Sequence, residues 1–258
     1  MYDEGVRELN IIAQDTTRYG IDLYGEQRLC ELLLRLAEIE FKWIRLYYTY
    51  PELLSDQLLS VMAETENIVS YFDIPLQHIS DSVLKRMGRR STKKEICALL
   101  DKIREKVPGA ILRTTFIVGF PGESEADFEE LCEFVKKTEF DRMGVFIYSE
   151  EEGTPAAKLD NQVDGEVKKE RFEKLMNIAK EISERKCTAR VGETLTVLAE
   201  YPEEYGYVGR SIYDAPDIDG KVFFMAERDV HAGEFVKVKI LDSDEYDLTG
   251  VVADEFAE

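Results

Sequence analysis

The segment from Leu112 to Glu123, LRTTFIVGFPGE, carries residue types that could bind a flat ring. Its apolar run predicts a strand covered by helices on both faces, which ends at Gly119. Glycine has no Cβ, so a ring could lie directly against the chain, and parallel α/β sheets bind ligands at the carboxyl ends of their strands. A tight turn in which Gly119 and Gly122 serve only backbone geometry is an equal alternative.

Three other apolar runs also end in polar residues. They are IIAQDTTRYG (Ile11–Gly20), DIPLQH (Asp73–His78) and FIYSEEEGTPAA (Phe146–Ala157). Because the carboxyl ends of parallel strands meet at one edge of a sheet, we expect these runs to present ligand-facing groups on the same rim. For any one of these polar residues alone, a satisfied cap on a strand end is an equally good interpretation.

Residues for metal binding or nucleophilic catalysis do not occur at useful spacings. The chain has four cysteines, Cys30, Cys97, Cys132 and Cys187, and two histidines, His78 and His231. The cysteines are isolated within helical patterns, which is typical of small buried or half-buried hydrophobic residues. Two distant histidines do not make a zinc site, and no Walker loop, dinucleotide-binding glycine motif or Ser-His-Asp order is found. We therefore predict no metal site in this chain.

Length and composition limit the class of protein. With 258 residues and 44% apolar content, the chain is long enough for one large and one small domain. It has no run of eighteen apolar residues and no signal peptide, so we expect a cytoplasmic protein without membrane contact. The net charge of −20 disfavours phosphate backbones and favours basic partners, unless it serves only solubility. The oligomeric state is not predicted.

One dense basic run stands against this acidic background. It consists of Lys85, Arg86, Arg89, Arg90, Lys93 and Lys94. Guanidinium groups bind carboxylates through two parallel hydrogen bonds, so Arg89 and Arg90 are candidates to bind the carboxylate of a cofactor or a substrate. A solvated helix face is the alternative for most of the run. Arg113, inside a strand pattern, is expected to pair with a buried acid, with a catalytic role as the alternative.

Apolar spacing predicts alternating strands and helices up to about Arg190. The predicted strands are Glu8–Ala13, Trp43–Tyr48, Ser70–Leu76, Ile111–Val118 and Met143–Tyr148. The predicted helices are Gln27–Glu38, Ser55–Glu64, Asp81–Met87, Lys93–Lys106 and Glu125–Thr138. Such alternation predicts a parallel sheet with right-handed crossovers. Five units are too few to close a barrel of eight strands, so we expect an open, curved partial barrel.

The ends of the predicted helices and the last quarter of the chain complete this picture. Ser124 with Asp127 predicts a capped helix start, Pro108 with Gly109 a helix end, and a long helix should follow Asp164. After Val191 the segments ETLTVLAE, YVGRSIY, KVFFMAE and EFVKVKILD alternate polar and apolar residues, which predicts a small antiparallel β-barrel. We therefore expect domains at residues 1–190 and 191–258.

Taken together and in this order, these motifs resemble the radical S-adenosylmethionine (SAM) methylthiotransferases, most closely those of the RimO type. The motifs are IIAQDTTRYG, DIPLQH, RTTFIVGFPGE, YSEEEGTPAA and DAPDIDG, and the resemblance covers essentially the whole chain. It implies an α/β fold, a partial barrel of the radical-SAM type followed by a small TRAM β-barrel. It also implies an enzyme that uses SAM and 4Fe-4S clusters to add a methylthio group to an aspartate of ribosomal small-subunit protein twelve.

The same resemblance implies contacts with the adenine of SAM. Ile117 and Gly119 match part of the adenine-contacting GxIxGxxE strand of this superfamily. Thr115 replaces the first glycine of that motif, and Glu123 falls one residue late, which leaves the role of the glutamate open. Tyr148 is a candidate to stack near the adenine, although a core tyrosine is the favoured alternative.

The resemblance also implies contacts with the rest of the cofactor. Gln77, at the end of DIPLQH, is placed to hydrogen-bond the ribose hydroxyls. Gln14 and Asp15 end the strand that meets the methionine amino group in this superfamily. The family's CxxxCxxC motif, whose thiolates hold a 4Fe-4S cluster, is absent. We therefore expect the first strand, the cluster loop and the family's amino-terminal domain to be missing, and this chain alone to be inactive.

Two alternatives stay open at this point. A tRNA methylthiotransferase of the MiaB type would share both domains, but residues 191–258 carry 17 acidic and 5 basic residues, a net charge of −12. An RNA-binding surface should be basic, so tRNA is the less favoured substrate. The second alternative is a non-catalytic fragment that only binds a partner.

Overall fold

The computed structural model describes residues 2–253, which form two compact units. The first, called the α/β unit below, comprises residues 10–40 and 44–179. The second, called the barrel unit, comprises residues 2–9, 41–43 and 180–253. Each unit is described by itself.

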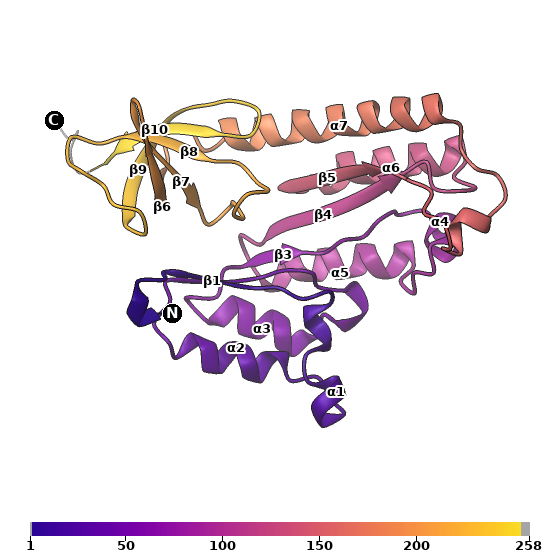
Figure 1. Cartoon of the computed structure of the whole chain (residues 1–258), viewed down its shortest axis with the longest axis horizontal. Coiled ribbons are helices and arrows are strands. Elements are labelled where there is room, and N and C mark those ends of the chain that lie inside the picture. Colours follow the sequence, from indigo (N-terminus) through magenta and orange to yellow (C-terminus); the bar gives the residue numbers. More distant parts are fainter. Residues whose placement is uncertain (1, 254–258) are drawn as a thin grey trace. The chain divides into compact units, whose positions relative to one another are not determined.

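Strands and helices follow one another along the chain, and Figure 1 labels most of them. The strands are β1 (Glu8–Ile11), β2 (Trp43–Leu46), β3 (Tyr71–Asp73), β4 (Ile111–Val118), β5 (Arg142–Ile147), β6 (Thr194–Glu203), β7 (Gly206–Ser211), β8 (Val222–Met225), β9 (Phe235–Ser243) and β10 (Leu248–Val252). The helices are α1 (Ile21–Tyr24), α2 (Leu29–Ala37), α3 (Asp56–Glu64), α4 (Asp81–Arg86), α5 (Lys93–Lys106), α6 (Glu125–Thr138) and α7 (Gly165–Thr188). Short 3-10 helices lie at Tyr2–Glu4, Thr16–Arg18, Pro51–Leu53 and Ala156–Lys158.

Three of the five strands predicted for one sheet form a parallel sheet in the α/β unit, and β1 and β2 pair in a separate two-stranded sheet. β3, β4 and β5 pair in sequence order, all parallel, with α5 and α6 as the crossovers between them. An isolated parallel bridge between Ile44 and Ile68 connects β2 to the segment before β3. Parallel neighbours cannot be joined by a tight turn, which is why a helix separates each pair in the sequence. The predicted α/β fold class is confirmed.

Every predicted strand and helix of this unit is present, with ends displaced by up to three residues. The largest displacement is at β3, which ends at Asp73 and not at Leu76. Pro75 has no N–H to donate to the ladder, and pairing with β4 resumes only at Gln77, which forms an isolated bridge with Phe116.

The expectation that β4 is covered on both faces is wrong. Thr114, Phe116 and Val118 are buried, whereas the alternate residues Arg113, Thr115 and Ile117 are half-buried. One face of the strand packs into the core, and the other, which carries two polar side chains and Ile117, is only half-covered. The continuous apolar run of the sequence covers only the last three residues of the strand, so it overstates the burial of the whole strand.

Capping residues fix where the two crossover helices begin. Ser124 and Asp127 form a reciprocal capping box at α6, with Ser124 Oγ accepting from the Asp127 N–H at 3.2 Å and Asp127 Oδ2 accepting from the Ser124 N–H at 2.9 Å. Thr92 and Glu95 form the same motif at α5. The predicted helix start at Ser124 is confirmed.

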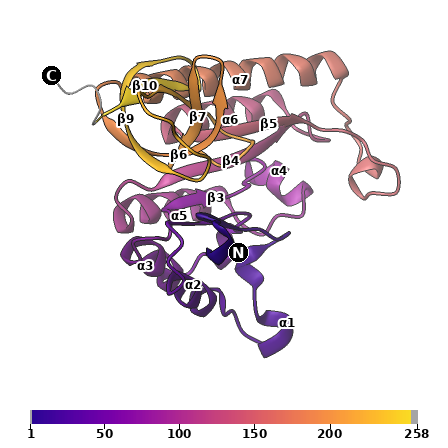
Figure 2. The ribbon, with the colours of Figure 1, turned by 60° about the vertical axis from the view of Figure 1, so that its left-hand side comes forward.

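The barrel unit contains a closed five-stranded barrel in the order β10-β8-β7-β6-β9, whose strands wrap around one core (Figure 2). Its pairs are antiparallel except β8 with β10, which are parallel. The fifth strand, β10, was not among the predicted segments. Fully buried valines from three strands lie in the core of the barrel: Val197, Val222 and Val238.

A buried arginine ties the first residues of the chain to this barrel. Arg210 of β7 donates to Glu8 Oε2 and to Glu200 Oε1, both at 2.6 Å, and to the Asp214 carbonyl at 3.0 Å. The Arg210 and Glu8 side chains are 6% and 4% exposed, so the pair is largely removed from water. Removing either partner would lower the free energy of unfolding strongly, because one charge would stay buried without its partner.

Candidate functional site

The carboxyl ends of β3, β4 and β5 form a rim that holds four of the predicted residues. The Gln77 N–H donates to the Thr115 carbonyl and the Ile117 N–H donates to the Gln77 carbonyl, each at 2.8 Å. The Tyr148 N–H donates to the Val118 carbonyl at 2.9 Å. These bonds place Gln77, Ile117 and Tyr148 on neighbouring segments of the sheet, and Gly119 follows directly after β4.

Two side chains at this rim carry buried polar atoms that lack a hydrogen-bond partner among the described residues. They are Gln77 Oε1 and the Tyr148 hydroxyl. Burial raises the pKa of Tyr148, with the charges of Glu150 and Glu151 adding to the effect. A buried polar atom without a partner costs about 1–3 kcal/mol, which a bound ligand with complementary groups can recover.

The backbone at Gln77 is also unusual. Its φ of 69° lies in the left-handed region of backbone conformations, which residues other than glycine, asparagine and aspartate rarely adopt. The two backbone bonds to β4 hold Gln77 in this conformation. Strained residues of this kind concentrate at ligand-binding sites, where the surrounding structure fixes them. Gln77 thus combines an enforced backbone with an unpaired amide oxygen.

The space beside Gly119 is not open. A Cβ built on Gly119 would overlap Cγ of Lys168, a residue of α7, and the φ of Gly119 is 73°. The Lys168 ammonium donates to the Tyr148 carbonyl at 3.3 Å and lies 4.9 Å from the centre of the Tyr148 ring. The glycine therefore allows a lysine stem to cross the end of β4, which the sequence did not reveal.

Glu123 clamps the turn that follows β4. Its Oε2 accepts from the N–H groups of Gly119 and Phe120, and its Oε1 lies 3.3 Å from Nη1 of Arg171. Burial raises the pKa of Glu123 to about 7, against the lowering influence of Arg171 and of the two backbone N–H groups. The glutamate whose role was open in the sequence thus shapes the turn.

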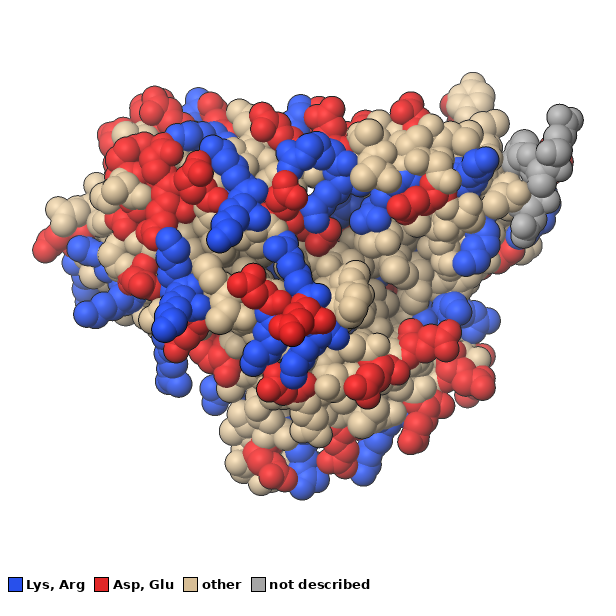
Figure 3. Space-filling model, turned by 180° about the vertical axis from the view of Figure 1, so that it is seen from behind, with Lys and Arg blue, Asp and Glu red and all other residues tan. Residues whose placement is uncertain are grey.

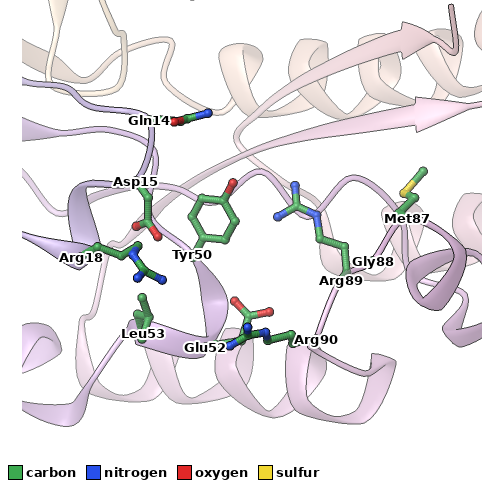
Figure 4. A pocket seen from close by; sticks show the side chains of 10 residues that line it. All are labelled: Gln14, Asp15, Arg18, Tyr50, Glu52, Leu53, Met87, Gly88, Arg89 and Arg90. Carbon is green, nitrogen blue, oxygen red and sulfur yellow. The ribbon is translucent and has the colours of Figure 1, made fainter. Parts of the chain in front are cut away.

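Four other predicted residues line a separate cavity of the α/β unit, of about 600 Å³. The lining residues are Gln14, Asp15, Arg18, Tyr50, Glu52, Leu53, Met87, Gly88, Arg89 and Arg90. In Figure 4 the side chains of Arg18 and Arg89 reach toward Tyr50 from opposite sides. The cavity therefore brings the first motif of the chain together with part of the basic run.

The predicted residues thus fall into two groups. Gln14, Asp15, Arg89 and Arg90 line the cavity, and Gln77, Ile117, Gly119 and Tyr148 lie at the rim of β3–β5. Sequence reasoning missed Arg18, Tyr50 and Lys168. Arg18 belongs to the motif that was singled out for Gln14 and Asp15, so its charge was an available signal. Tyr50 and Lys168 had no such signal.

Buried charge on the sheet explains another predicted residue. Arg113 of β4 donates to Asp73 Oδ1 of β3 at 2.8 Å, and Asp73 Oδ2 accepts from the Tyr48 N–H at 3.0 Å. The Asp73 side chain is 1% exposed. The expected pairing of Arg113 with a buried acid is confirmed, and the pair joins neighbouring strands.

Potential metal ligands are dispersed in the described residues. Nowhere in residues 2–253 do three or more histidine, cysteine, aspartate or glutamate side chains gather in a way that could hold a metal ion. Burial raises the pKa of Cys132 to about 11, so its thiol is a poor ligand. Across the same residues, every helix is too short or too polar to cross a membrane.

Comparison with known families assigns the chain. The model of the radical SAM superfamily matches residues 2–135, which is more than half of the chain. The chain belongs to the radical SAM superfamily. The model of the TRAM domain matches residues 191–253, which include all five strands of the barrel. The radical SAM match includes β1 to β4 and both groups of candidate residues except Tyr148.

Individual relatives are also similar to the chain. Ribosomal protein uS12 methylthiotransferase RimO of Desulforamulus reducens is 49% identical over 257 residues, covering 98% of this chain and 58% of that protein. The protein of the same name from Clostridium botulinum is 51% identical over 253 residues, covering 98% and 57%. The expected similarity to the RimO type is confirmed. The chain spans a little over half the length of these relatives.

Among solved structures the similarity is low. Coproporphyrinogen III oxidase (HemN) from Escherichia coli, a radical SAM enzyme, aligns with a TM-score of 0.45 at 18% identity. The alignment covers 57% of this chain and 35% of that chain.

Proposed function

We propose that this chain is the SAM-binding and target-binding part of a methylthiotransferase that modifies an aspartate of ribosomal small-subunit protein twelve. The observation that carries the proposal is the identity of about half of all residues, over 98% of the chain, with proteins named for that activity. Membership of the radical SAM superfamily supports SAM as the cofactor. We further propose the division into domains at residues 190 and 191, and a cytoplasmic location with the ribosomal target.

The adenosine part of SAM would contact residues of the β3–β5 rim. We propose Gln77, Ile117, Gly119 and Tyr148 for this part. The unpaired Oε1 of Gln77 is an acceptor and suits a ribose hydroxyl, and the half-buried Ile117 offers an apolar surface for the adenine. For a ring to reach Gly119, the stem of Lys168 must swing away, which an unbranched side chain permits.

The polar end of SAM and the substrate would meet the cavity. We propose that Gln14 and Asp15 meet the methionine amino group, since a carboxylate and an amide oxygen are acceptors for an ammonium. Arg89 and Arg90 are proposed as substrate-binding residues. Their guanidinium groups match a carboxylate in charge and shape.

The 4Fe-4S clusters of such an enzyme do not fit the residues of this chain. Cys30, Cys97, Cys132 and Cys187 lie on separate elements, and two of them are buried. Such clusters would supply, together with SAM, the radical chemistry of the reaction. The proposed contribution of this chain is to bind SAM, orient the target side chain and exclude water.

The alternative of a tRNA methylthiotransferase receives less support. The relatives are named for a ribosomal protein and not for tRNA. Charge agrees with this, because residues 191–258 have a net charge of −12 and RNA-binding surfaces are basic. On the face drawn in Figure 3, lysine and arginine are interspersed with aspartate and glutamate and form no large basic field.

A chimera tests the proposal. This chain would replace the matching part of the Desulforamulus reducens relative, and the purified protein would be incubated anaerobically with SAM, reductant, sulfide and ribosomal protein twelve. We expect mass spectrometry to detect one methylthio group on an aspartate of the target. A chimera that folds and binds its clusters yet modifies only tRNA, or neither substrate, would refute the proposal.

A further inference from the structure

Three arginines converge on the cavity of the α/β unit without ion-pair partners among the described residues. They are Arg18, Arg89 and Arg90. Arg18 and Arg90 are exposed and Arg89 is half-buried, with its guanidinium carbon 5.0 Å from the centre of the Tyr50 ring. A guanidinium held over a ring face keeps its N–H groups, which lie in its own plane, available to other acceptors. Two separate segments of the sequence thus supply donors to one space.

The two acids of the cavity are held by neighbours other than these arginines. Asp15 Oδ1 accepts from the hydroxyl of Thr17. Glu52 Oε1 accepts from the Ser91 N–H at 3.1 Å and from the Ser91 hydroxyl at 2.6 Å. Local bonds therefore fix both carboxylates, and the arginine donors stay available to a ligand.

The charges of the lining residues indicate which anion fits. Three arginines and two acids leave a net charge of +1. A singly charged anion neutralises this, whereas a phosphate group would add a second negative charge beside Asp15 and Glu52. A planar carboxylate also matches the fork of donors that a guanidinium presents. A nucleic-acid strand is disfavoured further by the net charge of −20 of the chain.

We propose that Arg18, Arg89 and Arg90 form a binding site for one carboxylate, with Arg18 as a member that the function above does not assign. The inference rests on the proposed function for the identity of the ligand. Two carboxylates are available in that reaction, the methionine carboxylate of SAM and the side chain of the target aspartate. Both present the same chemistry to the cavity, so the experiment must separate them.

The test follows the arginine side-chain N–H signals by NMR in the whole chain, labelled with ¹⁵N-arginine. Three probes are titrated: SAM, a short peptide with the target aspartate, and the same peptide with asparagine. Arg18→Gln is compared with Arg35→Gln, which removes the same charge from α2, where Arg35 pairs with Glu31 on the surface. Circular dichroism of both variants confirms folding.

We expect Arg18→Gln to weaken the binding of one carboxylate probe about tenfold, as charge-assisted hydrogen bonds predict, and Arg35→Gln to leave it unchanged. Loss of affinity for the aspartate peptide assigns the site to the substrate, and loss of affinity for SAM assigns it to the cofactor. Equal binding of the aspartate and asparagine peptides, together with unchanged SAM affinity in Arg18→Gln, would overturn the site. Carboxylate binding in a chain whose chimera transfers no methylthio group would refute only the proposed function.

Discussion

Acid should destabilise the α/β unit through one histidine, His78. Its side chain is fully buried, its Nδ1 accepts from the Ser80 N–H at 3.0 Å, and its Nε2 is buried without a partner in the described residues. Burial lowers the pKa of His78 to about 4; the charge of Asp127 opposes this, and that of Arg171 adds to it. The folded unit therefore holds a neutral imidazole at a pH where an unfolded chain binds a proton.

The size of the effect follows from the two pKa values. The unfolded histidine has a pKa of 6.5 and the folded one about 4, and each pKa unit corresponds to about 1.4 kcal/mol. Below pH 6.5 the unfolded state binds more protons than the folded state, so stability is lost as the pH falls from 6.5 toward 4. The loss attributable to His78 is about 3 kcal/mol.

Urea unfolding, followed by far-UV circular dichroism between pH 7 and pH 4, measures this loss. His78→Asn keeps an acceptor for the Ser80 N–H and removes the titration, and His231→Asn is the matched control because His231 is exposed. We expect the wild type and His231→Asn to lose about 3 kcal/mol more than His78→Asn on acidification. Equal losses in all three proteins would show that His78 is not held neutral by burial.

Three further predictions concern other described contacts. Arg210→Met should lower the free energy of unfolding of the barrel unit by about 3 kcal/mol, because Glu8 loses its buried partner; a loss below about 1 kcal/mol in chemical denaturation would contradict this. Glu123→Gln tests the raised pKa of Glu123. Because the pKa of this carboxyl is about 7 in the folded chain, the wild type should lose stability as the pH rises through about 7. The variant lacks this titration, so its free energy of unfolding relative to the wild type should be higher at pH 8 than at pH 5. A pH-independent difference would show that its ionised form is not destabilised. Gly119→Ala should lower the free energy of unfolding by about 1 kcal/mol less in a Lys168→Ala background than in the wild type, since the new methyl group displaces the lysine stem. If the two substitutions lower the free energy of unfolding additively, the two side chains do not interact.

Local patterns predicted the elements of the α/β unit well. Hydrophobic period, capping residues and Pro-Gly pairs depend on neighbours within a few residues, so apolar spacing located α6, and Ser124 with Asp127 fixed its start. β10 was missed because its segment, LTGVV, is short and follows an acidic turn, and its register is fixed by β8 and β9. A strand of this kind is recognised only once its partners are known.

Contacts between segments that are distant in the sequence were the part of the site that the sequence did not predict. Gln77 was found because it ends a recognisable motif, whereas its left-handed backbone depends on two bonds to β4. Lys168 lies about fifty residues from Gly119 in the sequence, in a helix whose pattern gives no reason to single it out. Tyr50 orients Arg89 through a ring contact that no spacing rule predicts.

Hydrogen exchange with and without SAM tests the central claim, that the β3–β5 rim binds this cofactor. We expect SAM to slow exchange in peptides that cover residues 74–79 and 117–123. Gln77→Leu should need about tenfold more SAM for the same protection, because the acceptor for a ribose hydroxyl is lost. Gln57→Leu, an exposed glutamine of α3, should behave as the wild type. Protection confined to residues 191–253, or equal SAM requirements in Gln77→Leu and the wild type, would contradict the assignment of the rim.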